Sequence, residues 1–419
     1  MAGPPARAPR GARGFRVALY GHDTCGLGHL RRNLALAGAL RGSPLRPDVL
    51  VVTGSPQAQR FARPAGVDLL VLPSVRKDAD GRYAADALDV PLQDVVALRA
   101  ATATAALTAW RPDLLVVDKA PTGFRGELLG ALTALRAAGR TRTVLGLRDV
   151  LDDPAAARAE WRRDGGEAAL ARFYDEVWVY GDPSVHDLRD DLRLPPAQRA
   201  ATRFLGYLAA DRPAGTGDPL PRRDPRARTV LASVGGGADG ERLTRALLRA
   251  PLPAGVELVL LPGPFAPAAL RSELVAAARR PEVHVVPFTD AVGRWAAAAD
   301  AVVCMGGYNS VAEVLATTTP ALVVPRTRPR REQQVRAEAL ARAGVLDVAT
   351  DPAPHELGAW VRRALRRGPV TREGLALDGL AAVRRRAAHL LRARPCGAPV
   401  PGLPGALAPV SGGSVARAC

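Results

Sequence analysis

An alternation of two kinds of segment, repeated twice along the chain, most constrains the fold. Short runs of β-branched and other apolar residues alternate with longer stretches, rich in Ala, Leu and Arg, that have helical spacing. Runs that are apolar throughout and separated by helices predict parallel strands in sheets covered on both faces. The first series of predicted strands covers 15–21, 48–54, 67–73, 113–118, 143–150 and 176–181, with predicted helices that include 29–41 and 126–139.

This series stops at residues 209–226, which are rich in Pro, Gly and Arg and have no apolar period, so they predict a linker. Two such series joined by a linker predict an α/β protein. In it, two Rossmann-like, doubly wound parallel-sheet domains face each other across a cleft. The second series of predicted strands covers 229–237, 256–263, 283–288, 300–307, 321–326 and 345–349.

The ends of the chain differ in composition from the two series. The last stretch is rich in Pro, Gly, Ala and Ser, which predicts disorder. The predicted organisation is a flexible N-terminus (1–14), an N-terminal domain (15–208), the linker (209–226), a C-terminal domain (227–373), a C-terminal helix (374–393) and a disordered tail (394–419).

The positive charge of the chain does not predict nucleic-acid binding. The net charge is +17, but Lys77 and Lys119 are the only lysines and the arginines are spread along the whole length. Aromatic residues make up only 4%, so platforms on which bases stack would be hard to build. Peripheral contact with anionic lipid head groups accounts for this charge better than nucleic-acid binding does. A basic surface that is merely solvated is the plainer interpretation.

The cysteines and the apolar runs bear on the compartment. Cys25, Cys304, Cys396 and Cys419 are widely separated and form no CxxC pair, which argues against a disulfide framework or a zinc site. The Arg-rich N-terminus lacks a signal-peptide core, and no stretch is long enough to span a bilayer. We therefore expect a cytoplasmic protein, with contact at the inner face of the membrane left open.

The loop after the first predicted strand is a candidate catalytic loop. Gly26 and Gly28 allow a tight turn and close approach of a ligand, and His29 begins the next helix. A neutral histidine that faces the cleft could accept a proton from a hydroxyl. The alternatives are a histidine that only caps the helix or a dinucleotide-binding turn, although the second strand ends in Thr53-Gly54 without the acidic residue that a dinucleotide's ribose needs.

Two glycine loops in the second series are candidate phosphate sites. Gly235, Gly236 and Gly237 lead into a helix and could form an anion-binding nest. A second loop, MGGYNSVAEVL (305–315), has the same order of strand, glycines and helix. Its candidate residues for a nucleoside diphosphate are Gly306, Gly307, Asn309 and Ser310 at the turn, and Glu313 one helical turn further on for a ribose diol.

A basic run follows this second loop. Arg328 and Arg330 lie near the end of a predicted strand, and Gln333 lies at the start of the next helix. Arginine clusters neutralise diphosphates, and an amide can hydrogen-bond the hydroxyls of a sugar. We therefore predict that these three residues contribute to the same site.

Charged residues at strand ends of the first series are candidates for the opposite side of the cleft. The plainer alternative is that they are ordinary loop charges and that Asp153 caps a helix before Pro154. The Asp-Ala-Asp at 78–80 resembles a metal-binding carboxylate pair but is more simply a polar loop, so no metal is expected. The candidates on this side, with Gly26 and Gly28, are Asp118, Lys119, Arg125, Arg148 and Asp149.

The run from Gly306 to Gln334 resembles the donor-binding segment of glycosyltransferase family 28, and it looks closest to a bacterial subgroup of predicted glycosyltransferases. The resemblance implies that Ser310 contacts phosphate, that Glu313 holds the ribose and that Gln333 lies near the donor sugar. The CGLGH turn is similar to the family's N-terminal glycine loop, which gives His29 the role of base or acceptor-orienting group. The chain departs from the family at Gly235, where a serine is usual, and in its richer basic run.

The resemblance implies a fold of the GT-B type and an inverting hexosyltransferase that needs no cofactor or metal. The donor would be a nucleotide-sugar, with a UDP-sugar favoured, and the unit transferred a hexose or N-acetylhexosamine. The acceptor would be a small molecule, a lipid-linked molecule or a polysaccharide. A nucleotide-sugar 2-epimerase and a non-catalytic nucleotide-sugar-binding protein remain alternatives.

Overall fold

The computed structural model describes residues 14–22, 27–61, 63–77, 82–212, 218–235, 239–263 and 266–393. Several predictions concern residues outside these ranges. They are the flexible N-terminus up to residue 13, the tail 394–419, the glycines Gly26, Gly236 and Gly237, and the acidic pair at 78–80.

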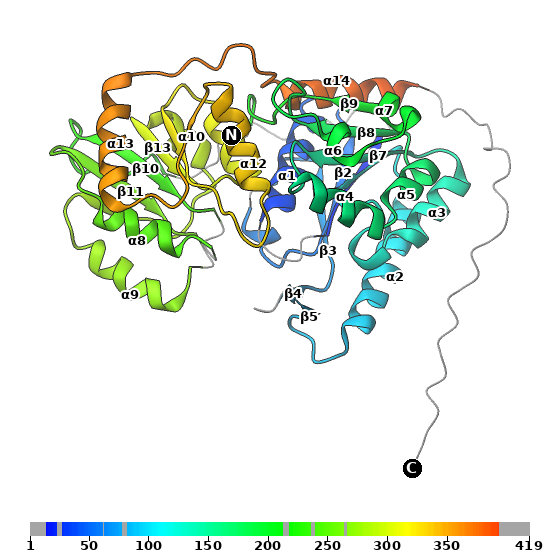
Figure 1. Ribbon diagram of the computed structural model, residues 1–419. Helices are drawn as coiled ribbons and strands as arrows, with labels where there is room; N and C mark the ends of the chain where they lie inside the picture. Colours follow the sequence, from blue (N-terminus) through cyan, green and yellow to red (C-terminus); the bar gives the residue numbers. More distant parts are fainter. Residues whose placement is uncertain are drawn as a thin grey trace, which may run out of the picture.

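Two parallel sheets form the framework of the described chain, and they lie side by side (Figure 1). The sheet of the first half has the order β3-β2-β1-β6-β7-β8-β9, and every neighbouring pair in it is parallel. Its strands are β1 (Arg16–Gly21), β2 (Asp48–Thr53), β3 (Val67–Val71), β6 (Leu114–Asp118), β7 (Arg142–Arg148), β8 (Glu176–Tyr180) and β9 (Thr202–Phe204).

The sheet of the second half has the order β12-β11-β10-β13-β14-β15 and is also parallel. Both sheets contain the strands predicted from their apolar runs, so the prediction of two doubly wound sheets is confirmed. The strands of the second half are β10 (Arg228–Ser233), β11 (Val256–Leu261), β12 (Val283–Val285), β13 (Ala301–Cys304), β14 (Ala321–Val323) and β15 (Asp347–Val348).

Successive residues of a strand point to opposite sides of the sheet, so strands that are apolar throughout give the sheet two apolar faces. Helices cover both of these faces in each sheet. In β1, Val17 and Leu19 pack toward one cluster, while Ala18 and Tyr20 pack toward another. The helices of the first half are α1 (Gly28–Arg41), α2 (Leu92–Trp110), α3 (Leu129–Ala138), α4 (Pro154–Arg163), α5 (Gly166–Phe173), α6 (Leu188–Leu192) and α7 (Pro196–Ala201), with short 3-10 turns η1 (Ala58–Arg60) and η2 (Phe124–Gly126). Those that follow are α8 (Glu241–Arg249), α9 (Ala268–Ala277), α10 (Val292–Ala298), α11 (Tyr308–Leu315), α12 (Glu332–Arg342), α13 (Pro354–Arg367) and α14 (Gly379–Arg392).

Three strands were not predicted. β9 and the antiparallel hairpin of β4 (Val75–Lys77) and β5 (Tyr83–Ala85) are only three residues long. Segments of this length carry no apolar period, so their pairing depends on the tertiary structure and not on a local pattern.

The last helix returns to the first half of the molecule. After α13 the chain crosses along the top of the view, and α14 lies against the first half (Figure 1). α14 packs against α1, and its Arg386 Nε donates to Glu176 of β8 at 2.9 Å. Gly206 is required at this crossing, because its φ is +83° and a Cβ would meet the carbonyl oxygen of Ala376 at 2.7 Å.

One apolar cluster joins the two halves. It contains Leu36 of α1 and Leu380 of α14 together with Val311 of α11. Tyr207, which follows β9, stacks on Tyr308 of α11 with 6.4 Å between the ring centroids. The strand ends of the two sheets are therefore held close to one another. Among the described helices, none combines the length and the apolar character needed to cross a membrane.

We predict that Leu380→Ala lowers the free energy of unfolding by about 2–5 kcal/mol, because Leu380 is fully buried and its loss leaves a cavity. Urea unfolding measures the loss, and hydrogen exchange should accelerate in α1 and β1 more than in β10. The control is Val275→Ala, which removes a side chain that is 62% exposed and should change stability by less than about 0.5 kcal/mol. Equal effects of the two substitutions would contradict the assignment of α14 to the core of the first half.

Candidate active site between the two halves

A histidine and an aspartate are paired at the carboxyl ends of β1 and β6. The register places Gly21 opposite Asp118, so the two strands end side by side. His29, in the first turn of α1, has its Nδ1 2.9 Å from Asp118 Oδ2. If Nδ1 carries the proton and donates to the carboxylate, Nε2 is left as a proton acceptor.

Asp118 is buried beneath this histidine, with 1% of its surface exposed. Arg32, one turn after His29 on α1, donates from Nε to the same carboxylate oxygen at 3.0 Å. Burial alone would raise the pKa of Asp118, but Arg32 and His29 outweigh burial and hold that pKa well below its usual range. Asp118, a predicted acceptor-side residue, is therefore buried against His29 and Arg32.

A cavity of about 210 Å³ lies between the two halves, next to this pair. The carboxyl ends of β10, β11 and β13 meet at one edge of their sheet, and Gly235, Gly263 and Gly307, which follow these strands, line the cavity. Arg31, Arg32 and Arg148 enter the lining from the first half. The predicted residues that line this cavity are Gly28, Gly235, Gly307, Asn309, Ser310 and Gln333.

Contacts between the halves hold the walls of this cavity. Asn309 Nδ2 donates to the carbonyl oxygen of Gly28 at 3.0 Å. Glu313, predicted to bind a ribose, is buried and forms an ion pair with Arg31, while its Oε2 is buried without a hydrogen-bond partner. Glu313 therefore does not line the cavity itself but is paired with Arg31, which does.

Gly306 has a packing role. A Cβ at this position would meet the carbonyl oxygen of Gln333 at 2.8 Å, so only glycine allows the loop to approach α12 this closely. The carbonyl oxygen of Gly306 accepts a hydrogen bond from Arg336 Nη1 at 2.9 Å. Gly306 supports the cavity loop but does not belong to the lining.

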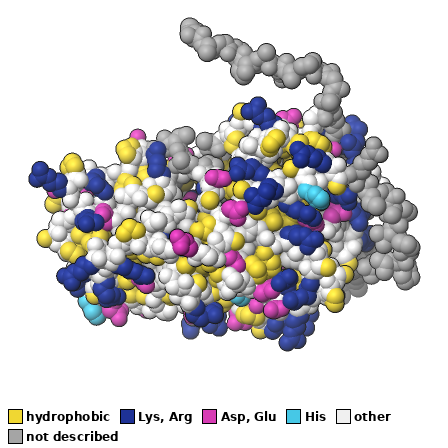
Figure 2. Space-filling view, turned by 90° about the horizontal axis from the view of Figure 1, so that it is seen from above, with side chains coloured by type: hydrophobic (Ala, Val, Ile, Leu, Met, Phe, Trp, Pro, Cys, Tyr) yellow, Lys and Arg dark blue, Asp and Glu magenta, His cyan; other side chains and the backbone are white. Residues whose placement is uncertain are grey.

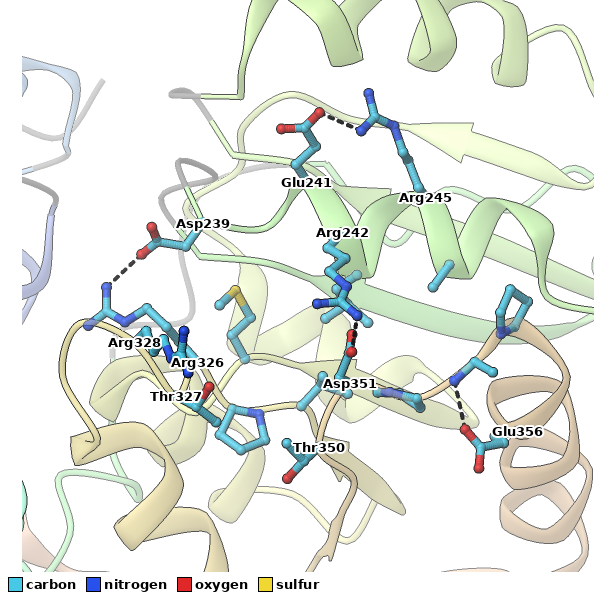
Figure 3. Close-up of a pocket in the computed structure, with 18 of the residues that line it drawn as sticks. Asp239, Glu241, Arg242, Arg245, Arg326, Thr327, Arg328, Thr350, Asp351 and Glu356 are labelled. Atoms are coloured by element: carbon cyan, nitrogen blue, oxygen red, sulfur yellow. Dashed lines mark hydrogen bonds and ion pairs between the residues drawn. The ribbon is translucent and has the colours of Figure 1, made fainter. Parts of the chain in front are cut away.

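Two predicted donor-binding arginines are directed elsewhere. Arg330 Nη1 donates to Glu160 of α4 at 2.7 Å, across the gap between the halves. Arg328 lines a separate cavity of about 950 Å³ in the second half, where Arg326 pairs with Asp239 and Arg242 with Asp351 (Figure 3). Neither arginine lines the 210 Å³ cavity, so the structure does not bring them together with Ser310 and Gln333.

A cavity of about 640 Å³ lies close to the His29–Asp118 pair, lined by residues of the first half and by Arg330 of the second. Two predicted acceptor-side residues, Lys119 and Arg125, line it together with Phe124 and Trp161. Burial, and then the positive charge of Arg330, lower the pKa of Lys119 to about 8. The cavity thus combines aromatic surface with cationic side chains.

The remaining acceptor-side candidates lie where the two halves meet. Asp149 is buried in an ion pair with Arg336 of α12, so it joins the halves. Arg148 and Gly28 line the 210 Å³ cavity and not the 640 Å³ cavity. Asp153 does cap α4, accepting from Ala155 N at 3.0 Å, as the plainer interpretation held.

Sequence reasoning missed His22. Its ring lies 4.3 Å from that of His29, centroid to centroid, and it lines the 640 Å³ cavity. Burial lowers the pKa of His22 well below its usual value, followed by the effect of the nearby His29. The sequence did contain a signal that Arg32 lies beside His29. Arg32 follows His29 by three residues, and residues at this spacing share one face of a helix. Within the described ranges, no three His, Cys, Asp or Glu side chains lie together as a metal-binding group.

Comparisons with known proteins identify the family. Residues 242–364 match the model of the Glycosyltransferase family 28 C-terminal domain. A curated relative from Acidothermus cellulolyticus is 30% identical over 343 residues, which cover 79% of this chain and 83% of the relative. That protein is a UDP-N-acetylglucosamine–N-acetylmuramyl-(pentapeptide) pyrophosphoryl-undecaprenol N-acetylglucosamine transferase. The chain belongs to glycosyltransferase family 28.

Solved structures agree with this family 28 fold. The glycotransferase of kitacinnamycin matches with a TM-score of 0.57 at 18% identity, over 90% of this chain and 96% of that one. The glycosyltransferase SnogD from Streptomyces nogalater matches with a TM-score of 0.55 at 20% identity, over 90% and 96%. The family 28 protein is therefore a glycosyltransferase of the GT-B type, as its sequence predicted.

The basic side chains of the family 28 enzyme are not gathered into a single stripe on the face seen in Figure 2. There, Lys and Arg side chains are scattered over both halves and interspersed with Asp and Glu. In the described chain many arginines are paired with carboxylates, for example Arg32 with Asp118 and Arg336 with Asp149.

We predict that Asp118→Asn lowers the free energy of unfolding by about 3–5 kcal/mol at neutral pH, since it leaves the buried Arg32 without its carboxylate. The pKa of Asp118 is lower in the folded than in the unfolded chain, so its stabilising effect is present above about pH 4 and is lost as the pH falls further. Urea unfolding at a series of acidic pH values should show a steeper loss for the wild type than for the variant. Asp68→Asn, at a site whose side chain is 79% exposed, is the control, and parallel curves for wild type and Asp118→Asn would contradict the pairing.

Proposed function

We propose that this enzyme transfers a hexose or N-acetylhexosamine from a UDP-sugar to an acceptor hydroxyl, with inversion and without a metal ion. The observation that carries the proposal is that the residues next to the His29–Asp118 pair line two cavities, although the pair itself belongs to neither lining. Gly28, the neighbour of His29, lines the 210 Å³ cavity, whereas Lys119, the neighbour of Asp118, and His22, beside the ring of His29, line the 640 Å³ cavity. A base in this position can serve an acceptor on one side and a donor on the other.

The 210 Å³ cavity is proposed to hold the nucleotide diphosphate. It combines the N-terminus of α11, which has no side-chain cap, with Ser310, Gln333 and arginines from the first half. Helix N-termini and guanidinium groups both favour phosphate oxygens. The name of the Acidothermus cellulolyticus relative specifies a UDP-sugar, which supports uridine as the base.

The 640 Å³ cavity is proposed to hold the acceptor. Phe124 and Trp161 offer apolar surface, and Lys119 and Arg125 offer positive charge. This lining suits a small or lipid-linked acceptor that carries a negative group better than a neutral polysaccharide. Contact of the basic protein with an anionic membrane surface is part of this proposal for the lipid-linked case.

His29 Nε2 would take the proton of the acceptor hydroxyl as that oxygen attacks the anomeric carbon of the donor. Asp118 holds the imidazole through Nδ1 and stabilises the cation that forms. A separate acceptor cavity supports transfer over 2-epimerisation, which needs no second substrate. We also propose residues 15–208 and 227–373 as acceptor and donor domains, joined by 209–226, with α14 completing the first.

We expect UDP to raise the melting temperature of the purified protein, whether or not EDTA is present. Nucleotide at about a hundred times its dissociation constant contributes roughly 2.7 kcal/mol to stability. Thermal unfolding with UDP, GDP, dTDP, ADP and NAD measures the response. Glu313→Gln should reduce the shift with UDP, and Glu338→Gln, an exposed change on α12, should not. A rise in melting temperature with NAD alone, or no rise with any nucleotide, would contradict the assignment of the donor site.

We expect His29→Ala to lower kcat by about 10²- to 10⁴-fold, because general base catalysis is lost, while the affinity for UDP stays close to that of the wild type. The measurement follows screening of UDP-sugars with candidate acceptors and compares turnover with nucleotide binding. His355→Ala, on the exposed start of α13, is the control. Unchanged turnover in His29→Ala would exclude it as the base.

A further inference from the structure

Arg148 is the guanidinium group of the interdomain cavity that lacks an ion-pair partner. It is the last residue of β7, and it lines the 210 Å³ cavity opposite the N-terminus of α11. Its Nε is buried without a hydrogen-bond partner, and no carboxylate forms an ion pair with it in the described parts of the chain.

The neighbouring arginines differ from Arg148 because each has its own carboxylate. Arg32 is paired with Asp118, and Arg336 is paired with Asp149. Glu332, which also lines the cavity, is engaged by Arg326 Nη2 at 2.8 Å. Burial raises the pKa of Glu332, but nearby positive charges, that of Arg148 first, outweigh it, and Glu332 Oε2 is buried without a hydrogen-bond partner. Glu332 therefore balances part of the charge of Arg148, while in the described residues no carboxylate oxygen forms an ion pair with its guanidinium.

Arg148 remains charged at neutral pH. Burial, followed by the positive charges of Arg32 and Arg336, lowers the pKa of Arg148 to about 10. A partly buried cation without a partner destabilises a fold, so its presence calls for a compensating role when the site is filled.

The next residue holds Arg148 in position. Asp149 accepts hydrogen bonds from Arg336 Nε at 2.8 Å and from Nη2 at 2.7 Å, and Arg336 Nη1 donates to Gly306 O at 2.9 Å. The end of β7 is thus fixed to the loop that leads into α11. This connection keeps Arg148 in the lining of the cavity that Gly307 of this loop also lines.

We propose that Arg148 binds the diphosphate of the donor and neutralises the charge that develops on it as the sugar leaves. The inference rests on the proposed function, and it assigns a catalytic residue to the half of the enzyme opposite the nucleotide. In the reaction, the bond from the anomeric carbon to the diphosphate oxygen breaks and its electron pair goes to that oxygen. The acceptor oxygen bonds to the anomeric carbon, and its proton goes to His29 Nε2. Arg148 and the N–H groups of α11 together stabilise the leaving oxygen without gaining or losing a proton.

The test compares ligands that differ only in phosphate. Calorimetry measures the binding of UDP and of uridine to the wild type, to Arg148→Met and to Arg367→Met, a change of an exposed arginine on α13. Arg148→Met should weaken UDP binding by about ten- to hundredfold and leave uridine binding unchanged, because only the diphosphate contacts the guanidinium. Arg367→Met should bind both ligands as the wild type does. Once an acceptor is known, kcat of Arg148→Met should fall by about 10²- to 10³-fold.

A purely structural role for Arg148 gives a different result. Without ligand, Arg148→Met should melt close to the wild type, since Arg148 forms no ion pair in the described residues, whereas Arg336→Met should melt lower because it strands Asp149. Equal losses of UDP and uridine affinity, or a melting temperature as low as that of Arg336→Met, would overturn the proposal. Wild-type binding of UDP with no loss in Arg148→Met would overturn it and leave the donor site standing. Failure of the wild type to bind UDP or uridine would overturn both.

Discussion

The ion pair between Arg336 and Asp149 is the contact on which the arrangement of the site depends. Both side chains are buried, so the pair is strong only because its geometry is good and its remaining donors are used. Arg336 donates to Asp149, Val150 and Gly306, and in this way it connects α12 and the loop that leads into α11 to the end of β7. The cavity between the halves exists in its present shape because this connection fixes both of its walls.

The other contacts around the cavity are also polar and directional. Arg31 pairs with Glu313, and Asn309 donates to Gly28. Such contacts can be exchanged for contacts with a substrate at little cost, because each partner offers hydrogen bonds of the same kind to ribose or phosphate. Glu313 still has one unused oxygen. The apolar cluster that contains Leu36 and Val311 holds the halves together next to these polar contacts.

The fold could be predicted from the sequence because its strands are apolar throughout and its helices are not. The site could be predicted only in part. Ser310, Asn309 and Gln333 lie in one cavity. Their grouping could be predicted because glycine turns at strand ends reveal the carboxyl edge of a sheet. The pairing of Asp118 with His29 follows from the position of β6 next to β1, and strand order is not encoded in any local pattern. The place of Arg148 in the cavity between the halves could not be predicted for a similar reason, since the surroundings of a side chain at a strand end depend on the domain packed against it.

The return of α14 to the first half also determines how the chain can fold as it is synthesised. The apolar face of α1 is covered by Leu380 and Val383, which leave the ribosome after all strands of the second half. The first half therefore cannot complete its core when its own strands have emerged, and it must wait, partly uncovered, while the second half is translated. Although the architecture looks like two domains in series, the molecule reaches its final state in one late step that docks the last helix.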